Sequence, residues 1–372
     1  MEKISQTEFA ELEIENEHEI GSGQAQNSTC YKSYDPQLER EIVAKYLDIH
    51  SMSGFDEYYQ EARLLHRARH SNIAEVLYAC QTDEHIIIVM DYYPGGSLKD
   101  VVQQDYLTVR EVINYALEFL TGLHHVHTKD LLHFDIKPSN VLIDVTGRGR
   151  LADFGMAKLR NEAGLARPDA LWPMHMPPEQ AGAGRNEQVS TKSDIYQAGV
   201  TLYTMLNGFD HLQRQYQDLE NESNPRAFEF AVADGNFPDR HDYLPHVPQH
   251  LRTIVDRAMN PQEAERYDSV LELMEGLARI DYSLDWKFDD QPAEQGVQKR
   301  WKSPFDNHER VARVHPPSYD SKRHLTDQWD LETRCYYESG TEQRDTDGCA
   351  YGLASEEEAD RAFRDYLRSL KD

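Results

Sequence analysis

Two short segments, His133–Asn140 and Asp153–Gly155, constrain the fold of this chain more than any other part of it. They read His-Phe-Asp-Ile-Lys-Pro-Ser-Asn and Asp-Phe-Gly. The residues that separate them are apolar on both sides of a Thr-Gly turn at 146–147, a pattern that predicts a short β-hairpin. Because a hairpin reverses the chain, it returns Asp153 to Asn140. Two carboxylates, one ammonium group and one amide are therefore expected at one place.

The side chains brought together in this way have the chemistry for phosphoryl transfer from Mg-ATP. Because that reaction passes through a loose transition state, a protein contributes mainly by positioning groups and neutralising charge. Asp135 can accept the proton of an attacking hydroxyl, and Lys137 can hold the γ-phosphate oxygens. Asn140 and Asp153 carry the oxygen ligands that Mg²⁺ prefers. The alternative, an acidic loop that lies beside a buried strand by chance, does not account for both segments.

Both segments resemble the catalytic loop and the Asp-Phe-Gly element of eukaryotic-type serine/threonine protein kinases. The run Ile42–Lys45 is similar to the strand that carries the family's ATP-binding lysine, here Lys45. Glu61, on an expected helix, is placed to pair with this lysine. A surface Lys–Glu pair is the alternative, but an exposed lysine is not expected within an apolar run.

Three residues further along the chain resemble structural parts of the same family. Glu179 corresponds to the glutamate that closes the activation segment, and Arg266 to the arginine that pairs with it. Asp194 corresponds to a helix aspartate that anchors the backbone of the catalytic loop. The resemblance thus extends well beyond the two chemical segments.

The resemblance implies an ATP site between two lobes. Ile20–Gly23 would approach the phosphates, because glycine lacks the Cβ that would collide, although the family's third glycine falls on Gln26. Met90 would be the gatekeeper, and the backbone of Asp91 and Tyr93 would meet the adenine. The implied cofactors are ATP and Mg²⁺, and the implied site consists of the catalytic residues Asp135 and Lys137, the metal ligands Asn140 and Asp153, and the ATP-binding residues Ile20, Gly21, Ser22, Gly23, Cys30, Ala44, Lys45, Glu61, Met90, Asp91, Tyr93, Asn140, Leu142 and Asp153.

The resemblance covers residues 12–280 and implies an α+β, bilobal kinase fold, with a β-rich N-lobe at 12–92 and an α-helical C-lobe at 94–280. Residues 281–372 resemble no family that we recognise. Short alternating stretches there predict a small sheet, and a capping box at Ser355–Glu358 predicts a last helix. We expect a C-terminal α+β module that recruits a substrate or partner protein, or that braces the kinase lobe through Trp286 and Trp301 packed on it.

The segment from Asp153 to Glu179 contains no serine, threonine or tyrosine. Many kinases order this segment by phosphorylation and pair the phosphate with the arginine before the catalytic aspartate, which is Phe134 here. The sequence therefore predicts a kinase without this arginine (non-RD type) that needs no phosphorylation of the segment. Trp172 replaces a threonine of the family and leaves the acceptor class open, although Lys137-Pro138 favours serine or threonine over tyrosine.

The composition of the chain limits the kinds of partner and the cellular compartment that we expect for it. The 372 residues carry a formal net charge of −27, which argues against nucleic acid or an anionic membrane as the main partner. No apolar run is long enough to cross a bilayer, and the N-terminus lacks the features of a signal peptide. The four cysteines are scattered and indicate free thiols in a reducing compartment. We expect a cytoplasmic protein with protein substrates.

Two other functions remain open. Phe134 and the loose glycine turn fit a pseudokinase that binds ATP and serves as a scaffold, but the full set of catalytic residues disfavours it. A small-molecule phosphotransferase shares the pattern around Asp135, but Pro178-Glu179, Asp194 and Arg266 belong to the protein-kinase pattern.

Overall fold

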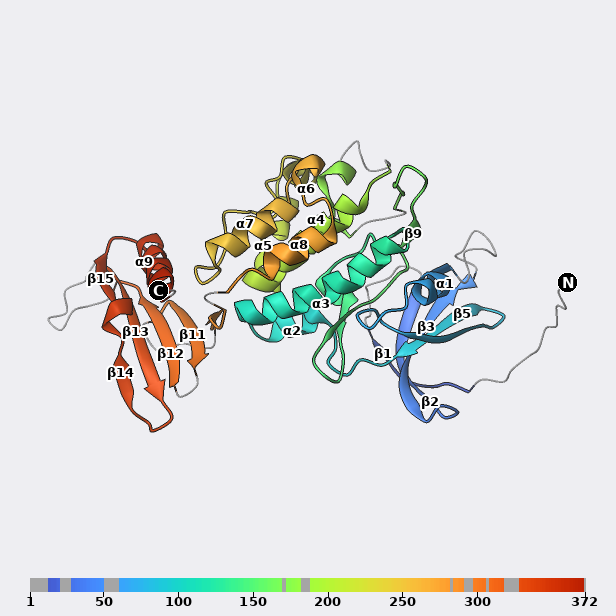
Figure 1. The fold of residues 1–372 in the computed structure, drawn as a ribbon, viewed down its shortest axis with the longest axis horizontal. Coiled ribbons are helices and arrows are strands. Elements are labelled where there is room, and N and C mark those ends of the chain that lie inside the picture. The colour runs from blue at the N-terminus through green and yellow to red at the C-terminus, as the bar shows by residue number, and fades with distance from the viewer. Residues whose placement is uncertain are drawn as a thin grey trace, which may run out of the picture.

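The computed structural model describes residues 13–20, 28–49, 60–168, 172–181, 188–281, 284–290, 297–305, 308–317 and 328–370. Figure 1 shows these residues as three parts in a row: a sheet with one helix, a group of helices, and a second sheet with one helix. The order along the molecule follows the order along the chain.

The first part is an antiparallel sheet covered by a helix. Its strands are β1 (Glu15–Ile20), β2 (Ser28–Asp35), β3 (Arg40–Asp48), β4 (Val76–Gln81) and β5 (His85–Asp91), in the order β1-β2-β3-β5-β4, and its helix is α1 (Gln60–Arg67). Strand β5 is buried on both faces: Ile87 and Val89 pack with Ile42 of β3, whereas Ile86 and Ile88 pack with Ala62 of α1. This two-sided burial explains why β5 is an uninterrupted apolar run.

The second part is mainly helical. Its helices are α2 (Leu98–Gln104), α3 (Val109–Thr128), α4 (Thr191–Asn207), α5 (Phe209–Glu220), α6 (Ala227–Ala233), α7 (Gln249–Ala258) and α8 (Val270–Leu277). Helix α4 is buried from Ser193 to Asn207 and forms the centre of this lobe. Together with the β-rich part, these helices form the predicted bilobal kinase architecture. Among the helices that the structure describes, none has the length and apolar character needed to span a bilayer.

Short strands in the helical lobe position the two chemical segments. They are β6 (Leu131–Leu132), β7 (Val141–Ile143), β8 (Gly149–Leu151) and β9 (Lys158–Leu159). Strand β7 pairs antiparallel with β8, which confirms the predicted hairpin. The Ala152 N–H then donates to the carbonyl oxygen of Asn140 at 2.8 Å, so that the residue before Asp153 lies directly against Asn140.

The third part is a sheet with one helix packed on it. Its elements are β10 (Lys287–Phe288), β11 (Lys299–Phe305), β12 (His308–His315), β13 (Trp329–Tyr337), β14 (Glu342–Arg344), β15 (Ala350–Leu353) and α9 (Glu356–Ser369). The strand order is β10-β11-β12-β13-β14, and β15 also pairs with β13. The ring of Phe363 in α9 stacks on Trp301 with 4.5 Å between ring centres. The ring of Trp286 meets Phe363 edge-on at 5.4 Å.

The module contacts the helical lobe through its first residues. The Arg110 guanidinium donates to both carboxylate oxygens of Asp285 at 2.6 and 3.0 Å, and the Tyr106 and Phe288 rings meet edge-on at 4.9 Å. Trp286 and Trp301 instead belong to the apolar core of the module itself. The expectation that these two tryptophans pack on the lobe is wrong, because both rings pack on Phe363 of helix α9 within the module.

Candidate functional site

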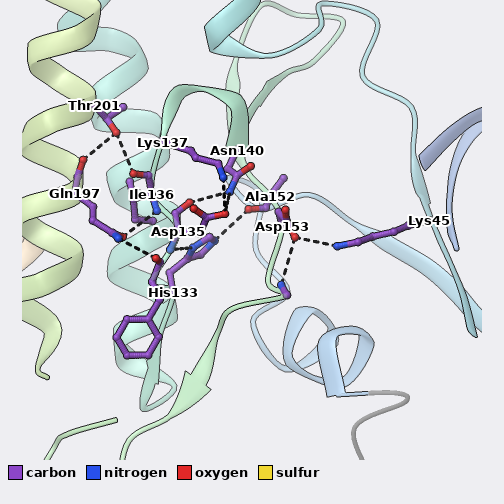
Figure 2. A network of polar contacts seen from close by, with 12 residues as sticks. Lys45, His133, Asp135, Ile136, Lys137, Asn140, Ala152, Asp153, Gln197 and Thr201 are labelled. Atoms are coloured by element: carbon purple, nitrogen blue, oxygen red, sulfur yellow. Dashed lines mark hydrogen bonds and ion pairs between the residues drawn. The ribbon is translucent and has the colours of Figure 1, made fainter. Parts of the chain in front are cut away.

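Three polar side chains of the buried helix α4 hold the loop that contains Asp135, namely Asp194, Gln197 and Thr201. Figure 2 shows the last two of them. The Asp194 carboxylate accepts the N–H groups of His133 at 2.9 Å and Phe134 at 2.8 Å. Gln197 accepts the Ile136 N–H at 3.0 Å and donates to the Phe134 carbonyl at 2.8 Å. These bonds hold Phe134 at φ 67, in the left-handed region that a phenylalanine rarely adopts.

The sequence indicated Asp194 as an anchor but not Gln197 or Thr201, whose hydroxyl donates to the Ile136 carbonyl at 3.3 Å. The available signal was their spacing, since residues i, i+3 and i+7 of a helix lie on one face. Polar residues at that spacing in a helix that is otherwise apolar indicate a backbone to be satisfied.

The Asp194 carboxylate is itself fully buried and stays ionised. Burial alone would raise its pKa, but the hydrogen bond from His127 at 2.8 Å and the N–H of His133 bring the pKa below its ordinary value. A negative charge in the core is thus stabilised by donors that belong to the catalytic loop and to helix α3.

Asp135, Lys137 and Asn140 form one buried group, each less than 9% exposed. Lys137 Nζ lies 2.9 Å from Asp135 Oδ2, and Asn140 Nδ2 donates to the same oxygen at 2.7 Å. Both neighbours therefore use one carboxylate oxygen. Among the described residues, nothing hydrogen-bonds to Asp135 Oδ1, which is left for an incoming donor.

Asp153 faces Lys45 from the end of the hairpin (Figure 2). Lys45 Nζ donates to Asp153 Oδ1 at 2.9 Å, and 39% of the aspartate side chain is accessible. Burial would raise the pKa of Asp153, but the charge and hydrogen bond of Lys45 and the charge of Lys137 lower it to about 2. The carboxylate is therefore ionised at neutral pH. Its second oxygen, Oδ2, does not take part in the hydrogen bond from Lys45.

The described residues expected around the adenine lie on strands β1, β2, β3 and β5, just after β5, and on strand β7 of the hairpin. Ala44 is fully buried on β3, and Cys30 and Met90 are the Cα partners of Lys45 and Val43 on the neighbouring strands. Tyr93 packs with Ala74, Leu142 and Ala152 in a small apolar cluster. Ile20 ends strand β1, and Asp91 ends β5, where its carboxylate pairs with Arg40.

Four expected residues lie wholly or with their side chain outside the part of the chain that the structure describes. Gly21, Ser22 and Gly23 lie outside the described residues. Glu61 belongs to helix α1, but its side chain lies outside them as well, so its pairing with Lys45 stays a prediction.

The residues present fit a divalent cation bound with a nucleotide. Asn140 commits its amide nitrogen to Asp135 and Asp153 commits Oδ1 to Lys45, which leaves Asn140 Oδ1 and Asp153 Oδ2 as oxygen donors. The backbone bond between Asn140 and Ala152 keeps the two side chains at neighbouring positions. Hard cations such as Mg²⁺ bind such amide and carboxylate oxygens and complete their shell with phosphate oxygens and water.

The far end of the activation segment is tied to the lobe by the predicted ion pair. Arg266, 1% exposed, donates to both oxygens of Glu179 at 2.9 and 2.7 Å, and the Ser193 hydroxyl donates to the same carboxylate at 2.6 Å. Burial would raise the pKa of Glu179, but these donors lower it. The pairing of Glu179 with Arg266 is confirmed.

Phe134 directly precedes Asp135, at the position for which the resemblance implies an arginine. Its side chain is 1% exposed and packs with Leu132, Met156, Ala166 and Val189. Ala166 and Val189 also exchange two backbone hydrogen bonds, of 3.0 and 2.8 Å. Apolar contacts thus hold the chain around Ala166 and Val189 against Phe134.

Comparison with known proteins agrees with this geometry. Residues 14–277 match the family described as "Protein kinase domain". The chain is 28% identical to "Receptor-interacting serine/threonine-protein kinase 2" of Bos taurus over 64% of this chain and 47% of the relative. It is 29% identical to "Serine/threonine-protein kinase pkn2" of Myxococcus xanthus over 71% of this chain and 32% of the relative. It is 28% identical to "Serine/threonine-protein kinase PrkC" of Bacillus subtilis over 67% of this chain and 38% of the relative.

The chain spans less than half the length of these relatives. The family match, however, covers most of the chain and includes every residue of the site described above. The chain therefore belongs to the protein kinase domain family.

Proposed function

We propose that this chain is an active protein kinase that transfers the γ-phosphate of ATP to serine or threonine hydroxyls of proteins. The observation that carries the proposal is that Lys137 and Asn140 both bond to Oδ2 of Asp135, so that no described residue hydrogen-bonds to Oδ1. A carboxylate held in this way can receive the acceptor's proton without losing its position. The serine/threonine kinases among the relatives support the acceptor class.

The residues then have distinct roles. The acceptor hydroxyl donates to Asp135; its oxygen forms a bond to the γ-phosphorus, the bond from that phosphorus to the bridging oxygen of ADP breaks, and the proton passes to Asp135. Lys137 and Lys45 bind phosphate oxygens of the substrate ATP. Mg²⁺, held by Asn140 and Asp153, would neutralise the phosphate charge.

The test is transfer of labelled γ-phosphate from ATP to a generic protein substrate by the chain and by Asp135→Asn. We expect the variant to lose transfer by about 10²–10⁴-fold and to keep nucleotide binding, because Asp135 accepts a proton and does not bind ATP. Undiminished transfer in Asp135→Asn contradicts the mechanism. Nucleotide binding without any transfer favours a scaffold, and transfer to a small molecule alone favours the other phosphotransferase class.

We also propose that the kinase is of the non-RD type and is active without phosphorylation of its activation segment. The apolar cluster around Phe134 and the pair Glu179–Arg266 hold both ends of the segment without a phosphate. Treatment of the purified chain with a phosphatase should leave its activity unchanged. Loss of activity traced by peptide mapping to a phosphate within residues 153–179 would contradict this.

For residues 281–372 we propose a brace for the connection between α2 and α3, with the outer surface free for a partner protein. The contacts of Arg110 with Asp285 and of Tyr106 with Phe288 support the brace. Four cysteines without disulfides support a cytoplasmic location.

A further inference from the structure

Trp172 covers the buried ammonium group of the candidate catalytic lysine. It directly precedes the short helix η3 (Pro173–His175), and 37% of its surface is exposed. The centre of its indole ring lies 4.6 Å from Lys137 Nζ, although Lys137 is only 7% exposed. The negative face of a tryptophan ring attracts a cation at this distance, more strongly where water is excluded.

The indole of Trp172 makes this contact from a partly exposed position. Its neighbours Met174 and Met176 pack in the core of the helical lobe, whereas Trp172 is exposed. A partly exposed aromatic ring that lies over a buried ammonium group is therefore a contact that needs a reason.

Lys137 has two partners among the described residues, and they come from different parts of the chain. Asp135 belongs to the same loop and binds the ammonium through Oδ2 at 2.9 Å. Trp172 belongs to the activation segment. With Asp135 as the sole partner, the ammonium would settle on the carboxylate that has to accept a proton. The indole offers a second position that is attractive, uncharged and unable to take a proton.

We propose that Trp172 is a positioning residue for phosphoryl transfer: its ring holds the Lys137 ammonium beside Asp135 and makes the placement of this lysine depend on an ordered activation segment. The proposal rests on the kinase function proposed above and assigns to the activation segment a direct contact with the transfer machinery. In this chain, an uncharged ring would couple the order of the activation segment to the transfer residues, a role that a phosphate on the segment has in many kinases.

The first test separates the ring's charge distribution from its bulk. Trp172→Leu keeps an apolar side chain without a π face, and Trp172→Phe keeps a smaller π face. We expect kcat to fall about tenfold or more in Trp172→Leu and about threefold in Trp172→Phe, with the KM for ATP within about twofold of the parent. Equal kcat in Trp172→Leu and the parent overturns the proposal, as does an equal loss in both variants.

A matched control uses a cation–aromatic pair of the same lobe far from the site in sequence. The Arg226 guanidinium lies 5.0 Å from the ring of Phe230, which is 48% exposed. Phe230→Leu should leave kcat and KM unchanged. Melting temperatures of all variants are measured in parallel, so that a loss of kcat with an unchanged melting temperature is assigned to positioning.

The sharpest test keeps the shape of the ring. Site-specific replacement of Trp172 by mono-, di- and tetrafluorinated tryptophan weakens the attraction for a cation in steps. The logarithm of kcat should fall steadily with fluorine number if the ring holds the ammonium. A flat series overturns the proposal, because shape and packing are then sufficient.

A binding measurement distinguishes failure of this proposal from failure of the proposed function. Adding Mg²⁺ and a non-hydrolysable ATP analogue should change the emission of Trp172, taken as the difference between the parent and Trp172→Phe, because the ammonium moves toward phosphate. The change should vanish in Lys137→Met. This result stands even if no protein substrate is phosphorylated. An unchanged emission, or an equal change in Lys137→Met, overturns the proposal while leaving kinase activity untouched.

Discussion

At the scale of single residues, burial removes two histidines from their ordinary titration range. His175 and His246 are 2% and 1% exposed. Burial lowers the pKa of each to about 3, helped by the charge of Lys137 for His175 and of Arg252 for His246. A histidine of the unfolded chain takes up a proton near pH 6.5. Between these two pH values the unfolded chain binds protons that the folded chain does not, so stability falls as pH is lowered.

We therefore predict a loss of about 2 kcal/mol of unfolding free energy per histidine between pH 7 and pH 5. His175→Met and His246→Met should each remove the loss of unfolding free energy that one histidine causes between pH 7 and pH 5. The double variant should remove the loss that both histidines cause. Denaturant unfolding at several pH values measures the free energy of unfolding of each variant. A double variant whose stability falls as steeply as that of the parent would show that other groups titrate. The carboxylate of Asp194, whose pKa is lowered, contributes stability that is lost only below its unfolded value of 3.8.

At the scale of elements, helix α4 determines the shape of the catalytic loop. Gln197 satisfies the Ile136 N–H and the Phe134 carbonyl, and both groups are buried. Thr201 reaches the Ile136 carbonyl only at 3.3 Å and also donates to the Gln197 carbonyl of its own helix at 2.9 Å. Removal of the Gln197 amide would therefore cost the loop two hydrogen bonds, whereas removal of the Thr201 hydroxyl would cost it one long hydrogen bond.

Gln197→Leu should destabilise the fold by about 2–4 kcal/mol, because it leaves two buried backbone groups without partners. Thr201→Val, nearly equal in shape, should cost about 1 kcal/mol and serves as the control. Calorimetry gives both values, and kcat should follow the same order, since Asp135 lies within the loop. Equal stability of the two variants is the outcome that argues against α4 as the support.

The activation segment is the second element whose position can be tested. Phe134→Ala removes the ring at the centre of the apolar cluster and should cost about 3–5 kcal/mol, whereas Phe134→Leu should cost less than about 1.5 kcal/mol. Hydrogen exchange at the amides of Ala166 and Val189, which bond to each other, should accelerate in Phe134→Ala first. Unchanged exchange there would mean that the cluster does not fasten the segment.

At the scale of the whole molecule, the C-terminal module and the helical lobe share a small junction. Among the described residues, two ion pairs cross it, Arg110 with Asp285 and Lys287 with Asp105, together with the edge-on contact of the Tyr106 and Phe288 rings. The Arg110 N–H also donates to the carbonyl of Leu284 at 2.7 Å. An exposed ion pair contributes little, so the aromatic and backbone contacts dominate. The module has its own core, and Leu284 at its start also packs against the core of the lobe.

Deletion of residues 282–372 should consequently leave transfer to a generic peptide largely unchanged and lower the melting temperature by a few degrees, as expected for a loss of about 1 kcal/mol. Phosphorylation of the cellular target should weaken if the module also binds a partner. Phe288→Ala in the full chain should reproduce the thermal shift alone. A truncated chain that melts at the same temperature as the parent would refute the brace. A truncated chain that modifies its target at full rate would refute the recruitment role.

The sequence by itself determined the parts whose chemistry is local. The spacing from His133 to Asp153 requires a hairpin, because the intervening residues can bury their apolar side chains only by pairing, and the hairpin alone brings Asn140 to Asp153. The family resemblance likewise located Lys45 and the pair of Glu179 with Arg266, since those motifs carry their own residue types.

Tertiary structure decided the contacts that depend on how separate elements meet. The ring of Trp172 reaches Lys137, Phe134 packs against Val189, and Phe288 contacts the lobe while the module's tryptophans face α9. An apolar side chain has many chemically acceptable partners, and burial rewards any of them about equally per unit of area. The backbone geometry chooses among them, and that geometry results from the whole fold, which local spacing does not encode.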